Sequence, residues 1–130
     1  MAYANLNKEG MVIDGFDSII IVKDLADIPC GVTLDVTAVT DNVVKAGHVL
    51  VQNKTTKVVK PLGITSGLYD SIDSSSEEYY GILKSSVLKS MPMAAVLRIG
   101  TVNAAAAAKF VGAEITSTIK AGLPHIDFIY

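Results

Sequence analysis

Hydrophobic and polar residues alternate along much of this chain, and the pattern predicts strands. In VTLDVTAV, residues 32–39, every second residue from Val32 is apolar, as in a strand with one buried face. Residues 18–25, SIIIVKDL, are β-branched at their centre and are predicted to form another strand. Most of the chain is therefore expected to be β-sheet.

A hairpin is predicted in the middle of the chain. The apolar segments HVLVQN and KVVKPL flank the polar turn NKTT. Pro61 has no amide hydrogen to donate, so it is expected to end its strand or to lie at a sheet edge. Residues 66–78 carry the densest loop signals, and strand-like YYGILKSSVL follows them.

A strand over residues 94–102 is predicted to run directly into a helix of five alanines, Ala104–Ala108. Asn103 can cap this helix through its side-chain oxygen, and Gly112 ends it. Alanine has a high helix propensity and little bulk, so the helix can approach a sheet or a neighbouring helix closely. A second short helix is expected between Thr116 and Gly122, followed by a terminal strand in HIDFIY.

These elements predict an α+β, β-rich fold: a small, partly open barrel or sandwich of short strands, with one or two short helices near the C-terminus. The 130 residues fit one domain. Residues 1–17 are polar and contain two glycines, which predicts an extended N-terminal arm before a single domain over 18–130. The apolar arm residues expected to contact a partner are Tyr3, Leu6, Val12 and Ile13.

Composition narrows the function classes. The formal net charge of −2 argues against a nucleic-acid binder, which would carry a basic surface. No apolar run approaches the roughly 20 residues that span a bilayer, so no membrane partner is expected. The first residues lack a secretory signal, and the single cysteine, Cys30, excludes an intrachain disulfide. These features fit synthesis in a reducing cytoplasm.

No catalytic, cofactor-binding or metal-binding residues are predicted. The histidines His48 and His125 lack the spacing of zinc ligands, and the glycines do not form a phosphate-binding motif. Two alternatives stay open. A small enzyme would use Cys30 with His48 or His125, although Cys30 is more simply a small buried residue. A cellular β-rich ligand-binding module would use Tyr69, Tyr79 and Tyr80 at a shallow site.

Four segments in fixed order give the chain a resemblance to a known family. They are KAGHVLVQNKTTKVVKPLG, YYGILKSSVL, AAVLRIGTVNAAAAAKF and TIKAGLPHIDFIY. This layout, over about residues 43–130, resembles tailed-phage head decoration proteins of the lambda-like decoration or head-fibre type. The resemblance depends mainly on the order of the four segments, because each segment alone is a weak match.

The resemblance implies a non-enzymatic structural protein of the virion. Such a protein sits on the capsid exterior, assembles as a homotrimer at three-fold positions and stabilises the head by bridging major capsid protein subunits. An N-terminal arm would reach the shell, although residues 1–17 could instead form a strand or hairpin of the domain's own sheet. Because alanine permits close approach, Ala104, Ala105 and Ala108 are expected at a subunit interface, with packing on the sheet of their own subunit as the alternative. The chain differs from the small lambda-like decoration proteins in two ways: its polar N-terminal segment is longer, and it lacks an arm rich in proline and threonine. The base of a head fibre is therefore an alternative.

Overall fold

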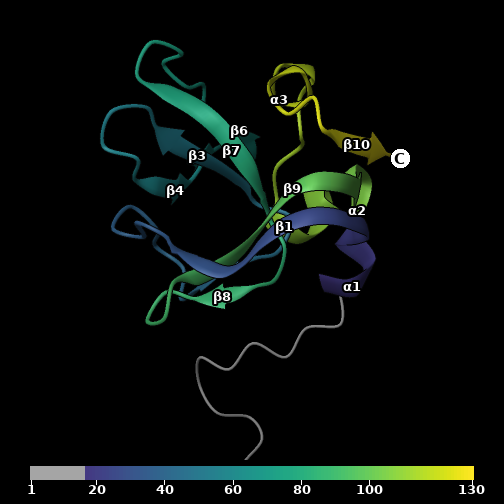
Figure 1. Ribbon diagram of the computed structural model, residues 1–130, viewed down its shortest axis with the longest axis horizontal. Helices are drawn as coiled ribbons and strands as arrows, with labels where there is room; N and C mark the ends of the chain where they lie inside the picture. The colour runs from purple at the N-terminus through teal and green to yellow at the C-terminus, as the bar shows by residue number, and fades with distance from the viewer. Residues whose placement is uncertain (1–16) are drawn as a thin grey trace, which may run out of the picture.

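The structure is a computed structural model that describes residues 17–130, and its main feature is one curled sheet (Figure 1). The strand order is β1-β9-β7-β3-β4, and β10 pairs with β9. The strands of this sheet are β1 (Ile21–Thr33), β3 (Val49–Asn53), β4 (Val59–Pro61), β7 (Glu77–Leu83), β9 (Met93–Asn103) and β10 (Ile126–Ile129).

Shorter elements surround this sheet. Two small sheets pair β2 (Val43–Val44) with β8 (Val87–Leu88), and β5 (Ile64–Thr65) with β6 (Leu68–Tyr69). The helices are α1 (Asp17–Ile20), α2 (Ala104–Val111) and α3 (Ser117–Gly122). The predicted class is confirmed, because the fold is β-rich with two short helices near the C-terminus. One isolated bridge joins Leu34 to Val59, and the sheet curls without closing into a barrel.

Strand β9 organises the sheet. One of its edges pairs with β1 along nearly its whole length. Its other edge pairs first with β7, at Val96 and Leu97, and then in parallel with β10 from Gly100 onward. Because α2 follows β9 without a loop, this strand-to-helix unit and the returning β10 form one side of the molecule (Figure 1).

Apolar side chains pack on both faces of the sheet, in two cores. The helix-side core contains Val49, Ile82 and Leu97 from the strands, together with residues of all three helices. The other core contains Leu50, Leu83 and Val96. Each of these residues is the direct sequence neighbour of one of the three strand residues in the helix-side core. Successive strand side chains point to opposite faces, so both faces of these central strands are buried.

The hairpin and the terminal elements match their predictions. Strands β3 and β4 pair in antiparallel fashion, and Pro61 is the last residue of β4 at the edge of the sheet. Thr116 caps α3 by accepting a hydrogen bond from the Ile119 amide. The predicted terminal strand is β10, and its parallel pairing with β9 was not part of the prediction.

Two predicted strands differ from the structure. Residues 18–25 begin with α1, so the strand starts only at Ile21 and continues to Thr33. Residues 32–39 are not a strand beyond Thr33 except for the bridge at Leu34. The side-chain oxygen of Asp35 accepts hydrogen bonds from the amide and hydroxyl groups of Thr37, and this local turn replaces the ladder.

Candidate binding surfaces

The predicted arm contacts Tyr3, Leu6, Val12 and Ile13 lie outside the described residues. The described domain begins with α1, where Ile20 is fully buried in the helix-side core. The predicted boundary between arm and domain, at residues 17 and 18, falls inside this helix. The surroundings of the Cys30 side chain also lie outside the description, although its backbone belongs to β1.

The alanine helix α2 packs one face inward. The Asn103 side chain accepts a hydrogen bond from the Ala106 amide at 3.0 Å, as predicted for a cap, and Gly112 ends the helix in a left-handed conformation. Ala104 and Ala107 are buried, and a Cβ on Gly47 would lie only 2.9 Å from that of Ala107. Small side chains therefore permit close packing within this domain.

The three alanines predicted at a subunit interface differ in how far they are exposed on α2. Ala105 is exposed and Ala108 is partly exposed, whereas Ala104 is covered by its own domain. Contact with another subunit stays a prediction, and Ala105 and Ala108 are the residues placed to make it.

The two histidines have different surroundings. His48 is largely buried, its Nε2 donates to the Leu62 carbonyl oxygen at 2.7 Å, and its ring packs against the edge of Tyr69. Burial lowers the pKa of His48, so its ring is neutral near pH 7. His125 is exposed in the turn before β10. Among residues 17–130, no cluster of histidine, cysteine and carboxylate side chains is arranged to hold a metal ion.

The tyrosines of the alternative ligand site do not act together. Tyr69 is buried, its hydroxyl oxygen accepts a hydrogen bond from the Val49 amide, and burial raises its pKa well above the ordinary value. Tyr80 lies under Arg98, whose guanidinium carbon is 4.7 Å from the ring centre. Tyr69 and Tyr79 line one groove, Tyr79 and Tyr80 line a second and smaller one, and neither of these two contains all three tyrosines.

The first of these grooves, which we call the α3 groove, has a volume of about 700 Å³ and lies between α3, the start of β7 and the segment before it. Its apolar lining comes from Ile119, Ile72 and the tyrosine rings. Burial raises the pKa of the Tyr79 hydroxyl above its ordinary value. The groove was not predicted, because its walls come from segments separated by about 50 residues of sequence.

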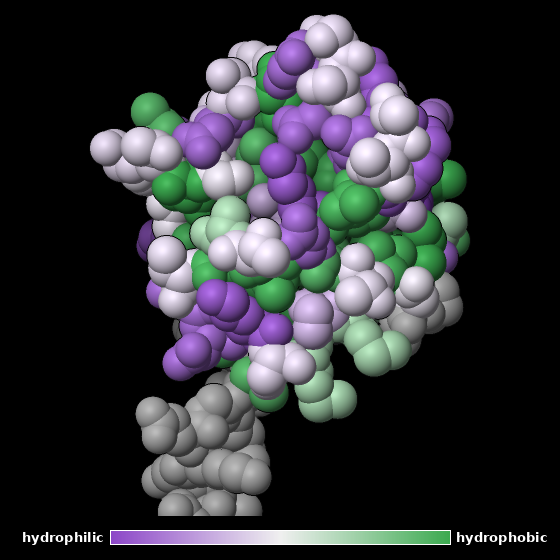
Figure 2. All heavy atoms as spheres, turned by 90° about the vertical axis from the view of Figure 1, so that its left-hand side faces the viewer, coloured by the Kyte–Doolittle hydropathy of each residue, from purple (hydrophilic) through white to green (hydrophobic). Residues whose placement is uncertain are grey.

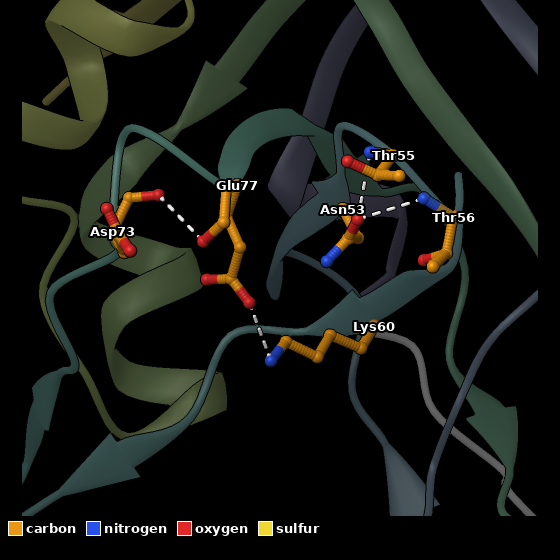
Figure 3. A network of polar contacts seen from close by, with 7 residues as sticks. Asn53, Thr55, Thr56, Lys60, Asp73 and Glu77 are labelled. Carbon is orange, nitrogen blue, oxygen red and sulfur yellow. Dashed lines mark hydrogen bonds and ion pairs between the residues drawn. The ribbon is translucent and has the colours of Figure 1, made fainter.

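A polar network fixes the segment that forms one wall of the groove (Figure 3). The Lys60 ammonium lies 2.8 Å from a Glu77 carboxylate oxygen, and the Glu77 amide donates to the Asp73 carbonyl oxygen. Nearby, the Asn53 side chain accepts hydrogen bonds from two amides in the turn between β3 and β4. These contacts hold the turns at this end of the sheet. Figure 2 shows hydrophilic and hydrophobic residues interspersed over the adjoining face.

Large apolar side chains are exposed at several places that sequence reasoning did not select. Leu25 on β1 is 66% exposed and Met91, in the turn before β9, is 67% exposed. The others are Ile19, Val22, Val58, Ile64, Leu68, Met93, Ile99 and Tyr130. The alternation pattern cannot distinguish these residues from core residues, because it reports polarity and not which face of a curled sheet is covered.

One ion triad joins β1 to β7 across the intervening strand. The Lys84 ammonium, just after β7, lies 2.5 Å from carboxylate oxygens of both Asp24 and Asp27. The hydrogen bond that the Lys84 ammonium donates to Asp27 is the main cause that lowers the pKa of Asp27. The two carboxylates likewise raise the pKa of Lys84.

Replacing Lys84 with methionine is expected to lower the melting temperature at pH 7. The folded-state pKa of Asp27 lies below its unfolded value, so this stabilisation is present at neutral pH and is lost as the pH falls through that lowered pKa. The difference in melting temperature between wild type and Lys84→Met should therefore shrink toward pH 2, as thermal scans can measure. Lys120→Met, at an exposed position of α3, is the control. A difference independent of pH would contradict the role of the triad.

Comparison with protein families, with characterised proteins and with solved structures finds no match to this chain. No helix among the described residues has the length and apolar character needed to cross a membrane.

Proposed function

We propose that this protein is a non-enzymatic decoration protein of a phage capsid, bound to the capsid exterior, where it bridges major capsid protein subunits. The observation that carries the proposal is the unit formed by β9, α2 and β10. The sequence resemblance depends on a strand that enters an alanine helix and on an apolar terminal strand. In the fold these segments are neighbours, with β10 paired to β9 from Gly100 to Asn103.

The exposed apolar side chains support a role in contacts with other chains. Leu25 and Met91 are about two-thirds exposed, and further apolar residues lie on β1, on β9 and in the short hairpin of β5 and β6. Large apolar side chains that stay exposed on the folded domain are available for contacts with other chains. Many shallow contacts, each weak but repeated around a symmetric site, suit a protein that holds a shell together.

A homotrimer suits this role, because a three-fold capsid position favours a closed assembly of the same symmetry. The outer face of α2, with Ala105 and Ala108, has side chains small enough for close approach between subunits. The arm over residues 1–17, with Tyr3, Leu6, Val12 and Ile13, provides the contact with the shell in this proposal.

Co-sedimentation with expanded heads, assembled from the major capsid protein of the same genome, tests the proposal. The protein should saturate the heads and raise the temperature at which they break open. Its mass on the heads, compared with the mass of the shell, should correspond to three copies at each three-fold position. No binding to expanded heads, or binding without a change in their thermal stability, would overturn the proposal.

A ligand-binding module is the second candidate, and the α3 groove is the observation that favours it. A concave site lined by two of the three expected tyrosines has the apolar lining and convergent polar groups of a binding site. The two candidates are compatible, since neither Ala105 nor Ala108 of α2 lines the groove.

A further inference from the structure

The hairpin of β5 and β6 is attached to the rest of the domain mainly at its two ends. Residues 63–68 are all exposed, whereas Leu62 before them and Tyr69 after them are buried in the helix-side core. One isolated bridge, between Leu68 and Glu114, adds a contact near the tip of the hairpin. A segment with so few buried contacts can open locally at a lower free-energy cost than the core strands.

The first residue of β3 and the residue before it hold both ends of this hairpin. The Leu62 amide donates to the Val49 carbonyl oxygen at 2.9 Å, and the Val49 amide donates to the Tyr69 hydroxyl oxygen at 3.3 Å. His48 joins the same two ends. Its Nε2 donates to the Leu62 carbonyl oxygen at 2.7 Å, and its ring meets the Tyr69 ring edge-on, with 5.5 Å between the ring centres. We call these four contacts the His48 clasp.

The His48 clasp is suited to a neutral ring and not to a charged one. The ring is largely buried, and no carboxylate of residues 17–130 forms an ion pair with it. The Leu62 carbonyl oxygen already accepts a hydrogen bond from the neutral ring, so protonation brings no new partner. The lost hydration of a buried imidazolium is therefore left largely uncompensated.

His48 is also the group of this region that changes charge in mildly acidic solution. Other titratable groups line the same cavity, contact the ring or belong to segments hydrogen-bonded to the His48 backbone. They are Asp35, Asp41, Lys45, Lys60, Tyr69, Asp70, Glu77 and Lys84. Carboxyl, ammonium and phenol groups ordinarily titrate outside the range from about pH 5 to about pH 7, in which histidine does titrate.

We propose that protonation of His48 releases the β5–β6 hairpin from β3. In the closed form the ring is neutral and the His48 clasp is made. Water reaches the charged ring when the hairpin moves away, so the open form binds the proton more tightly than the closed form. The clasp therefore has its full strength above about pH 6.5 and weakens as the pH falls below that value. Opening exposes Leu62 and Tyr69.

The test is amide hydrogen exchange of the full chain, followed by NMR at pH 7 and pH 5 and expressed as protection factors. These factors remove the pH dependence of intrinsic exchange. Protection of the Val49 and Leu62 amides should fall about ten-fold at the lower pH, because the open form takes up a proton that the closed form resists. The Lys84 amide, which donates to the Ala95 carbonyl oxygen between β7 and β9, should keep its protection.

The variant His48→Gln keeps an N–H donor but cannot be charged, so its protection factors should be the same at both pH values. The matched control is His125→Gln, at an exposed position, which should retain the wild-type fall. A fall that persists in His48→Gln, an equal fall at Lys84, or no fall in the wild type would overturn the proposal. Ring nitrogen shifts of the wild type add a measurement that needs no variant. A His48 ring that is fully charged at pH 5, while Val49 and Leu62 stay protected, would also overturn it.

Discussion

Replacing Gly100 with alanine is expected to destabilise the domain by about 3 kcal/mol, toward the upper end of the cost of overpacking. A Cβ at this position would lie 2.2 Å from the Lys23 carbonyl oxygen and 3.0 Å from Leu97 Cδ1. The first contact is to the backbone of β1, which cannot turn away as a flexible side chain can. Because Gly100 pairs with both β1 and β10, a shift there disturbs three strands.

Thermal scans should show the melting temperature of Gly100→Ala lowered by roughly 10 °C. Gly112→Ala is the matched control, because no atom lies within 4 Å of the added Cβ and only the positive φ of 91° is unfavourable. It should cost about 1 kcal/mol. A smaller effect at Gly100 than at Gly112 would mean that β1 and β9 are not packed as described.

Deleting residues 1–13 is expected to abolish binding to expanded heads while leaving the melting temperature nearly unchanged. In this proposal the arm makes its contacts on the shell, and the two cores are formed by residues of the described domain. The lost contacts would be those proposed for Tyr3, Leu6, Val12 and Ile13. An extended segment that adds to a sheet edge on its partner gains its binding energy there and not in its own domain.

Head co-sedimentation and thermal scans on the same truncated sample separate the two roles of the arm. The matched control replaces residues 1–13 with a glycine- and serine-rich segment of equal length, which should also fail to bind. If truncation unfolds the domain, these residues belong to its core and the anchoring proposal fails. If truncated protein still saturates the heads, the anchor lies elsewhere, and the exposed residues of β1 are then the next to test.

Local signals in the sequence predicted the C-terminal half of the fold well. Asn103, Gly112 and Thr116 act through backbone groups within a few residues, so their roles can be inferred without the fold. The hairpin of β3 and β4 is equally local. The parallel pairing of β10 with β9 depends on where α2 and α3 place the chain, and no local pattern encodes it.

The first strand shows why the N-terminal half was harder to predict. The sequence predicted two separate strands, over 18–25 and 32–39, whereas β1 is one strand from Ile21 to Thr33 whose register against β9 shifts several times, including between Ile28 and Val32. The alternation of apolar residues over 32–39 predicted a strand, but most of this segment is a turn. Leu34 is buried there and forms only an isolated bridge with Val59, so an apolar residue in an alternating pattern can be buried outside a strand. The α3 groove was beyond prediction because Asp70, Tyr79 and Ile119 meet only in the folded chain.

The most direct measurement of the central claim is a cryo-EM reconstruction of expanded heads, assembled from the major capsid protein of the same genome, after incubation with the full chain. Additional density is expected on the outer surface at three-fold and quasi-three-fold positions. Three copies of this fold should be found there, each touching at least two major capsid protein subunits. Bare three-fold positions at saturating protein concentration would contradict it.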